Sequence, residues 1–141
     1  MTHYIHTSID IKASREKIWK ILINFNNYTN WNPYILMVEG EAAVGNKLKV
    51  HLLAPGGKGR IYYPKIEIKT ENELLIWRSK VVSRGLIRGK RTFELIDNSN
   101  NNTTFIHKEE LGGLLTRFYN TENNKAGIIA MNEKLKGLAE K

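Results

Sequence analysis

The segment that most constrains the fold is the C-terminal stretch from Leu114 to Ala139, which contains no proline. Its apolar side chains recur at steps of three and four residues, with gaps, as Leu115, Phe118, Ala126, Ile129, Met131, Leu135 and Leu138. This spacing predicts one long amphipathic helix. Most of the chain before it has the alternation of short strands separated by turns, so we expect an α+β fold in which an antiparallel sheet wraps one helix.

The composition narrows the class of protein. A chain of 141 residues with 41% hydrophobic residues is long enough for one domain with a real core. It has no cysteine, which excludes disulfides and thiolate metal sites. The N-terminus lacks the pattern of a secretion signal, and no apolar run approaches the length of a membrane-spanning helix. We therefore expect a cytoplasmic protein without a membrane span.

The net charge of +8 raises the question of a nucleic-acid partner. The lysines and arginines are spread along the sequence, however, and form no tight basic run. A solvated basic surface is the favoured interpretation, and we expect no nucleic-acid partner. The oligomeric state stays open between a monomer and a homodimer.

The rest of the chain divides into two short helices and seven strands. We expect a first strand over residues 4–11, a helix that is capped by Ser14 and ends near Asn24, and a short helix or turn over residues 25–30. The remaining strands are expected at Tyr34 to Ala43, Lys47 to Ala54, Arg60 to Lys69, Glu73 to Val82, Gly89 to Asp97 and Thr103 to Leu111. All seven are expected to pair antiparallel.

One part of the predicted long helix departs from its pattern. Residues Asn120 to Lys125 are almost wholly polar, although apolar residues lie on both sides. A helix packed on a sheet along its whole length rarely has such a stretch near its middle. Two interpretations remain open: the helix breaks there, or this turn borders a wet pocket or its mouth.

The last two strands define their own register. The loop from Asn98 to Asn102 has a common hairpin length. If Asp97 pairs with Thr103, counting gives the further pairs Leu95 with Phe105, Phe93 with His107 and Arg91 with Glu109. We therefore predict a buried ion pair between Arg91 and Glu109, next to His107. Such a pair would keep the Glu109 carboxylate charged and make it a poor general base.

Several segments together resemble a known superfamily. They are Ala13 to Trp19, Trp31 to Tyr34, Gly40 to Gly45, Pro55 to Gly57, Arg91 to Leu95 and His107 to Gly113. In this order they are similar to the SRPBCC superfamily, which includes the START and birch-pollen-allergen proteins, in its polyketide cyclase/dehydrase-like branch. The resemblance implies a single helix-grip domain over residues 1–141, with a seven-stranded antiparallel sheet curled around the C-terminal helix and a largely apolar cavity between them.

The resemblance implies that this cavity binds a lipid, a polyketide or a similar hydrophobic molecule. The candidate ligand-binding residues are Trp31, Val50, Tyr62, Trp77, Arg91, Phe93, Phe105, His107, Glu109, Phe118 and Met131. Trp77 is assigned to the cavity because the cavity-facing tryptophan of the superfamily falls at this position. We expect no cofactor, and the four scattered histidines are not arranged as metal ligands.

His107 and Glu109 are also the candidates for catalysis. A histidine beside a carboxylate can transfer protons, as a cyclase or dehydratase reaction requires. The alternative is a polar pair that is satisfied within the protein or that orients a ligand. We favour a non-enzymatic ligand-binding domain, and keep a polyketide cyclase/dehydratase and a co-chaperone-like protein-interaction module as alternatives.

Overall fold

The computed structural model describes residues 2–81, 87–113 and 119–141. Its strands form two antiparallel sheets. The five-stranded sheet has the order β1 (Thr2–Ile11), β8 (Thr103–Gly112), β7 (Ile87–Asp97), β6 (Leu74–Val81) and β5 (Lys65–Thr70). The three-stranded sheet has the order β2 (Ile35–Glu39), β3 (Lys49–Leu52) and β4 (Arg60–Tyr62). The helices are α1 (Arg15–Ile23), the short 3-10 helix η1 (Phe25–Asn30) and α2 (Thr121–Ala139).

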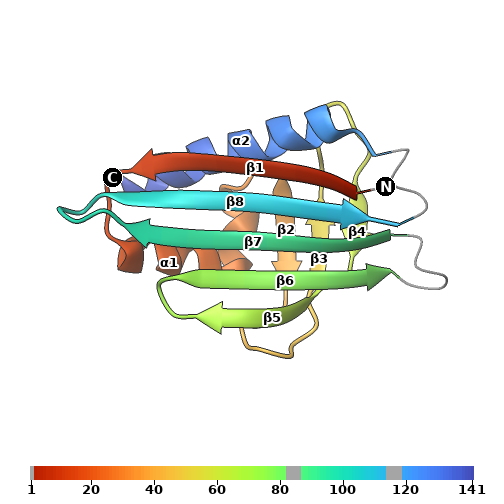
Figure 1. Ribbon diagram of the computed structural model, residues 1–141, viewed down its shortest axis with the longest axis horizontal. Coiled ribbons are helices and arrows are strands. Elements are labelled where there is room, and N and C mark those ends of the chain that lie inside the picture. The colour runs from red at the N-terminus through yellow and green to blue at the C-terminus, as the bar shows by residue number, and fades with distance from the viewer. Residues whose placement is uncertain (1, 82–86, 114–118) are drawn as a thin grey trace.

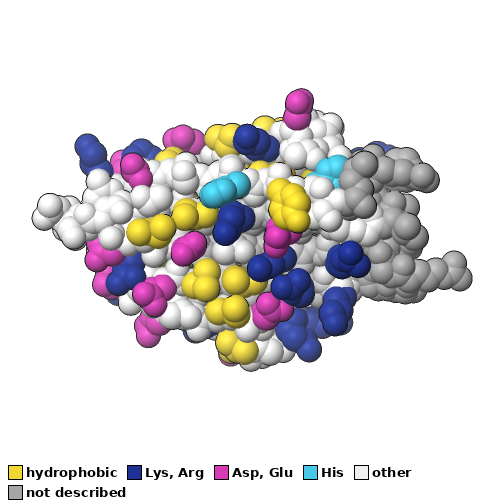
Figure 2. Space-filling view, in the orientation of Figure 1, with side chains coloured by type: hydrophobic (Ala, Val, Ile, Leu, Met, Phe, Trp, Pro, Cys, Tyr) yellow, Lys and Arg dark blue, Asp and Glu magenta, His cyan; other side chains and the backbone are white. Residues whose placement is uncertain are grey.

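The helices and the smaller sheet lie on one face of the five-stranded sheet. Figure 1 shows this sheet facing the viewer, with α2 behind β1 and with α1 and the smaller sheet behind the other strands. We call the covered face the inner face. Trp77, Phe93 and Phe105 of this face form one core with residues of both helices and of the smaller sheet. The opposite, outer face is open, with charged and apolar side chains interspersed (Figure 2).

The prediction of seven strands is wrong, because the described residues contain eight. The strand expected from Arg60 to Lys69 is two strands: β4 pairs with β3, whereas β5 pairs with β6. The residues between them include Pro64, which has no N–H group to donate to a strand ladder. The two sheets remain connected here, since Gly45 N–H donates to the Ile66 carbonyl at 2.8 Å and Ile66 N–H donates to the Asn46 carbonyl at 3.0 Å.

The long helix begins later than expected. The first residues of the predicted span, 114–118, lie outside the described part of the chain, and α2 begins at Thr121. Asn120 is its N-cap, with a side chain that accepts a hydrogen bond from the Asn123 N–H at 2.9 Å. A capping asparagine satisfies a backbone donor that has no partner within the helix, so the polar stretch at Asn120 to Lys125 is the start of the helix. The remaining 19 residues make about five turns.

The buried face of α2 also differs from the apolar pattern. Ile129 is 45% exposed, whereas Ile128, Met131 and Leu135 are fully buried. The buried stripe includes two asparagines, Asn124 and Asn132, which a count of apolar residues cannot include. Polar residues occupy this stripe because each finds a buried hydrogen-bond partner, as described below.

The predictions for α1 and for the β7–β8 hairpin are confirmed. Ser14 caps α1 by accepting a hydrogen bond from the Lys17 N–H at 3.2 Å. The hairpin pairs Asp97 with Thr103, and the register continues through Leu95 with Phe105, Phe93 with His107 and Arg91 with Glu109. In its loop, Ser99, Asn100 and Asn101 have φ angles of 71°, 56° and 56°, a region that asparagine tolerates better than most residues.

Candidate functional site

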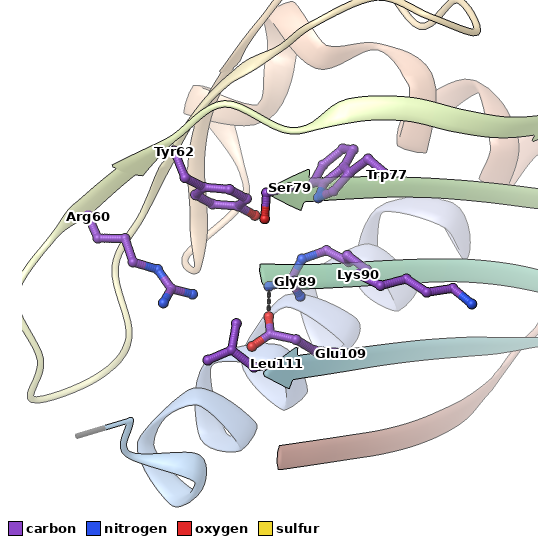
Figure 3. Close-up of a pocket in the computed structure, with 9 residues that line it drawn as sticks. Arg60, Tyr62, Trp77, Ser79, Gly89, Lys90, Glu109 and Leu111 are labelled. Carbon is purple, nitrogen blue, oxygen red and sulfur yellow. Dashed lines mark hydrogen bonds and ion pairs between the residues drawn. The ribbon is translucent and has the colours of Figure 1, made fainter. Parts of the chain in front are cut away.

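A small cavity lies at one end of the inner face, where β6, β7 and β8 meet β4 (Figure 3). We call it the inner cavity. Its volume is about 40 Å³, and it is lined by Arg60, Tyr62, Trp77, Ser79, Gly89, Lys90, Arg91, Glu109 and Leu111. Two small residues face each other in its wall, because Ser79 pairs with Gly89, which in turn pairs with Leu111.

A second, larger cavity adjoins the first, and we call it the outer cavity. Its volume is about 360 Å³. It is lined by the turn that precedes β4, by the end of β3 and by the start of α2, with Leu52, Ala54, Gly57, Lys58, Arg60, Leu111, Tyr119, Asn120, Asn123 and Asn124. Arg60 and Leu111 line both cavities. The polar stretch at Asn120 to Lys125 therefore starts the helix and also borders a pocket.

The predicted ion pair is present in the wall of the inner cavity. Arg91 and Glu109 are only 3% and 4% exposed, and the guanidinium donates to one oxygen of the Glu109 carboxylate. The hydroxyl of Tyr119 donates to the other oxygen. Burial by itself lowers the pKa of Arg91, but the Glu109 carboxylate together with Tyr62, Tyr34 and Tyr119 outweighs this effect and holds the pKa well above its usual value. Burial, together with the Glu109 carboxylate, raises the pKa of Tyr119.

His107 lies on the other side of Arg91. Its Nε2 is 2.7 Å from Nη1 of Arg91 and its Nδ1 is 3.0 Å from Oδ1 of Asn132. A guanidinium cannot accept a hydrogen bond, so Nε2 is the acceptor, and Nδ1 carries the proton and donates to Asn132. Burial and, after it, the Arg91 charge lower the pKa of His107 well below its usual value. His107 is therefore a neutral imidazole with both ring nitrogens in use.

The hydrogen-bond chain continues across the core to β1. Nδ2 of Asn132 donates to the Thr7 hydroxyl at 2.9 Å, and that hydroxyl donates to the His107 carbonyl at 2.9 Å. This ring of bonds joins β1, β8 and α2 through side chains that are all buried. Because each member has its partner, the network can stay buried at little cost and fixes the orientation of His107.

Tyr34 connects the same network to α2. The Cζ atom of the Arg91 guanidinium lies 5.3 Å from the centre of the Tyr34 ring. The Tyr34 hydroxyl donates to Oδ1 of Asn124 at 2.7 Å. Gly127 of α2 makes room for the ring, since a Cβ atom there would lie 2.3 Å from Cδ1 of Tyr34. The close approach of helix and tyrosine therefore depends on a glycine at this position.

The candidate residues from the sequence fall into two groups. Tyr62, Trp77, Arg91 and Glu109 line the inner cavity. The others whose placement is described line neither cavity: Val50, Phe93, Phe105, His107 and Met131 are buried in the core, and Trp31 is half-buried against the ring of Tyr28. Phe118 lies outside the described residues.

The expectation of a largely apolar cavity between the sheet and the C-terminal helix stays a prediction, and neither cavity described here lies under the middle of the five-stranded sheet. Aromatic rings fill that space: Phe93 packs edge-on against Trp77 at 5.4 Å between ring centres and is stacked with Phe105 at 6.0 Å. The inner cavity is displaced toward one end of the sheet, and charged and polar residues contribute much of its lining.

Sequence reasoning missed Arg60, Ser79, Gly89 and Tyr119 as residues that line a cavity. A partial signal existed, because Ser79 has the same strand parity as Trp77, and Arg60 has the same parity as Tyr62. Small residues at Ser79 and Gly89 become informative only when the two strands are known to pair.

Neither a metal centre nor a membrane-spanning helix is present among the described residues. Over residues 2–81, 87–113 and 119–141, no three His, Asp or Glu side chains gather as metal ligands would. Within the same ranges, no helix combines the length and the apolar character that crossing a membrane requires.

A curved antiparallel sheet that holds a long C-terminal helix, with two short helices after the first strand, defines the helix-grip fold. The chain belongs to the family described as polyketide cyclase / dehydrase and lipid transport, whose profile matches residues 2–140. The resemblance to the SRPBCC superfamily is thereby confirmed. No curated protein matches the sequence.

Solved structures show the same fold at low sequence identity. An aromatase/cyclase from a Streptomyces species has a TM-score of 0.80 at 11% identity, over 99% of this chain and 94% of that chain. A START superfamily protein from Mycobacterium smegmatis has a TM-score of 0.75 at 17% identity, over 98% and 97%. Norcoclaurine synthase from Thalictrum flavum, in complex with dopamine and hydroxybenzaldehyde, has a TM-score of 0.73 at 15% identity, over 98% and 86%.

Proposed function

We propose that this protein binds a small molecule with an apolar body at the junction of the inner and outer cavities. The observation that carries the proposal is that the two cavities adjoin, with Arg60 and Leu111 in the walls of both. Leu52 and Ala54 add apolar surface to the outer cavity, whose volume of about 360 Å³ falls in the usual range for small-molecule sites, roughly 300–1,000 Å³. The family description, which includes lipid transport, is consistent with this role.

The engaged side chains favour binding over acid–base catalysis. A general base needs a free lone pair that can reach the substrate. His107 uses one ring nitrogen to donate to Asn132 and the other to accept from Arg91, and it does not line either cavity. Glu109 lines the inner cavity, but Arg91 and Tyr119 each donate to one of its oxygens, so a substrate would have to compete with both donors for the carboxylate. These contacts favour a structural role for His107 and Glu109 over proton transfer.

Tryptophan fluorescence tests the proposal, with decanol as a neutral apolar probe. Trp77 lines the inner cavity, so decanol should change the emission of the protein, and Trp77→Phe should reduce that change. Trp19→Phe is the matched control, because Trp19 lies in α1 and lines neither cavity. A response that is the same in wild type and Trp77→Phe would count against a ligand beside Trp77.

A second test blocks the site. Ser79→Leu places a larger side chain in the inner cavity and should weaken decanol binding measured by calorimetry. Ser8→Leu makes the same chemical change at an exposed position of β1 and should leave binding unchanged. If decanol binds neither wild type nor the Ser8 variant, the proposed function is wrong.

A further inference from the structure

Three side chains that line the inner cavity carry a hydrogen-bond donor that no acceptor among the described residues satisfies. Nε1 of Trp77 and Nε of Arg91 belong to side chains that are 1% and 3% exposed, and neither has a partner within those residues. Nε of Arg60 is likewise buried and without a partner among those residues, although Arg60 as a whole is half-buried. Trp77, Arg91 and Arg60 all line the inner cavity, and a buried donor without an acceptor is costly. Their common requirement is an occupant that accepts hydrogen bonds.

The charges of the lining do not balance. Arg91 is paired with Glu109, and Lys90 extends away from the cavity and pairs with Glu110 at 3.8 Å (Figure 3). Arg60 takes part in none of the ion pairs formed by the described residues. Its guanidinium lies 5.5 Å from the ring centre of Tyr62 and 5.7 Å from that of Tyr119. One uncompensated positive charge therefore stands where the two cavities meet.

We propose that the inner cavity binds a carboxylate, and that this group is the polar end of a ligand whose apolar chain occupies the outer cavity. The inference rests on the proposed function and adds the chemical class of the ligand. An ionised carboxylate only accepts hydrogen bonds, so it matches a set of N–H donors, and its single negative charge matches the single excess charge of Arg60. The inner volume of about 40 Å³ holds only a few water-sized groups, at roughly 10–15 Å³ each, which suits a carboxylate and excludes a ring.

Calorimetric titration with decanoate and decanamide tests the inference. The two molecules have the same chain and similar heads, but only decanoate carries a charge. Wild type should bind decanoate at least about tenfold more tightly than decanamide, as expected for charge-assisted hydrogen bonds. Arg60→Gln should remove most of that preference while leaving decanamide affinity within about twofold, because the amide makes no ionic contact with Arg60.

Lys134→Gln is the matched control. Lys134 is an exposed residue of α2 that lines neither cavity, so this variant lowers the net charge by the same amount as Arg60→Gln but leaves both cavities intact. It should keep the preference for decanoate. Equal losses in the two variants would mean that overall charge attracts decanoate, which overturns the inference.

The results also separate this inference from the proposed function. If decanamide and decanol bind and decanoate binds no more tightly, the cavity holds only water at its donors and the carboxylate assignment is wrong, while the binding function stands. If none of the three molecules binds, the proposed function fails and the assignment fails with it.

Discussion

Two arginine–glutamate pairs lie on opposite faces of the five-stranded sheet. Arg91 and Glu109 bridge β7 and β8 on the inner face with side chains 3% and 5% exposed, whereas Arg78 and Glu67 bridge β6 and β5 on the outer face with side chains 43% and 41% exposed. Each pair makes direct hydrogen bonds. The two pairs have the same chemistry, so burial is the main difference between them. It makes each inner charge depend on its partner, while water can replace either partner of the outer pair.

The inner face should respond most strongly to mutation. Arg91→Ala and Glu109→Ala should each lower the free energy of unfolding by about 3–5 kcal/mol, because each leaves an unpaired charge in the core. The double variant should lose less than the sum of the two, since it leaves neither charge behind. Urea unfolding of wild type, the two single variants and the double variant measures the coupling energy between Arg91 and Glu109. Additive losses would show that the two side chains do not interact.

A second prediction compares the two faces of α2. Gly127→Ala should destabilise the protein by about 1–3 kcal/mol, because the added methyl group would overlap the Tyr34 ring. Gly137→Ala should stabilise it by about 0.5–1 kcal/mol, since that position is exposed with open space around it and alanine is the better helix former. Thermal unfolding measures both effects, and a stabilised Gly127→Ala variant would mean that Tyr34 does not pack against this helix as described.

The third prediction concerns pH and the inner histidine. In the folded protein the pKa of His107 is held well below its usual value, first by burial and then by Arg91. The unfolded chain takes up a proton near the ordinary histidine value of about 6.5, so stability is present above that pH and is lost as the pH falls below it. The loss from this one group can reach about 1.4 kcal/mol per pH unit. Urea unfolding between about pH 7 and pH 5 should show this slope in wild type.

Two variants test whether His107 causes this dependence of stability on pH. His107→Gln should flatten it, whatever its effect on stability at neutral pH, because the group that titrates is gone. His6→Gln removes an exposed histidine of β1 and should keep the slope of wild type. A wild-type slope in His107→Gln would place the responsible group elsewhere.

The outer pair should give the smallest effect. The hydrogen bond from Arg78 lowers the pKa of Glu67, but water and salt surround both side chains. Glu67→Gln and Arg78→Gln should therefore each change stability by no more than about 1 kcal/mol, and added salt should shrink the difference. Losses as large as those at Arg91 would mean that exposure is not what separates the two pairs.

The sequence alone was sufficient for the elements whose geometry is local. The capped start of α1 and the pairing of Arg91 with Glu109 followed from a serine, a hairpin loop and the two-residue period of a strand. The presence of a long C-terminal helix and the helix-grip resemblance also followed from the chain. These features depend on neighbours in sequence, or on counting outward from one turn.

Tertiary structure alone decided the features that depend on distant partners. The chain passes from one sheet to the other at Pro64 because β4 pairs with β3 whereas β5 pairs with β6. Asn124 and Asn132 can be buried in α2 because each bonds a buried side chain from far along the chain, Tyr34 and His107 respectively. The inner cavity has the same origin. Ser79 and Gly89 line it from paired strands of one sheet, and Arg60 lines it from the other sheet. A cavity is set by how side chains of separate strands fill a shared volume, so no spacing within a single strand records it.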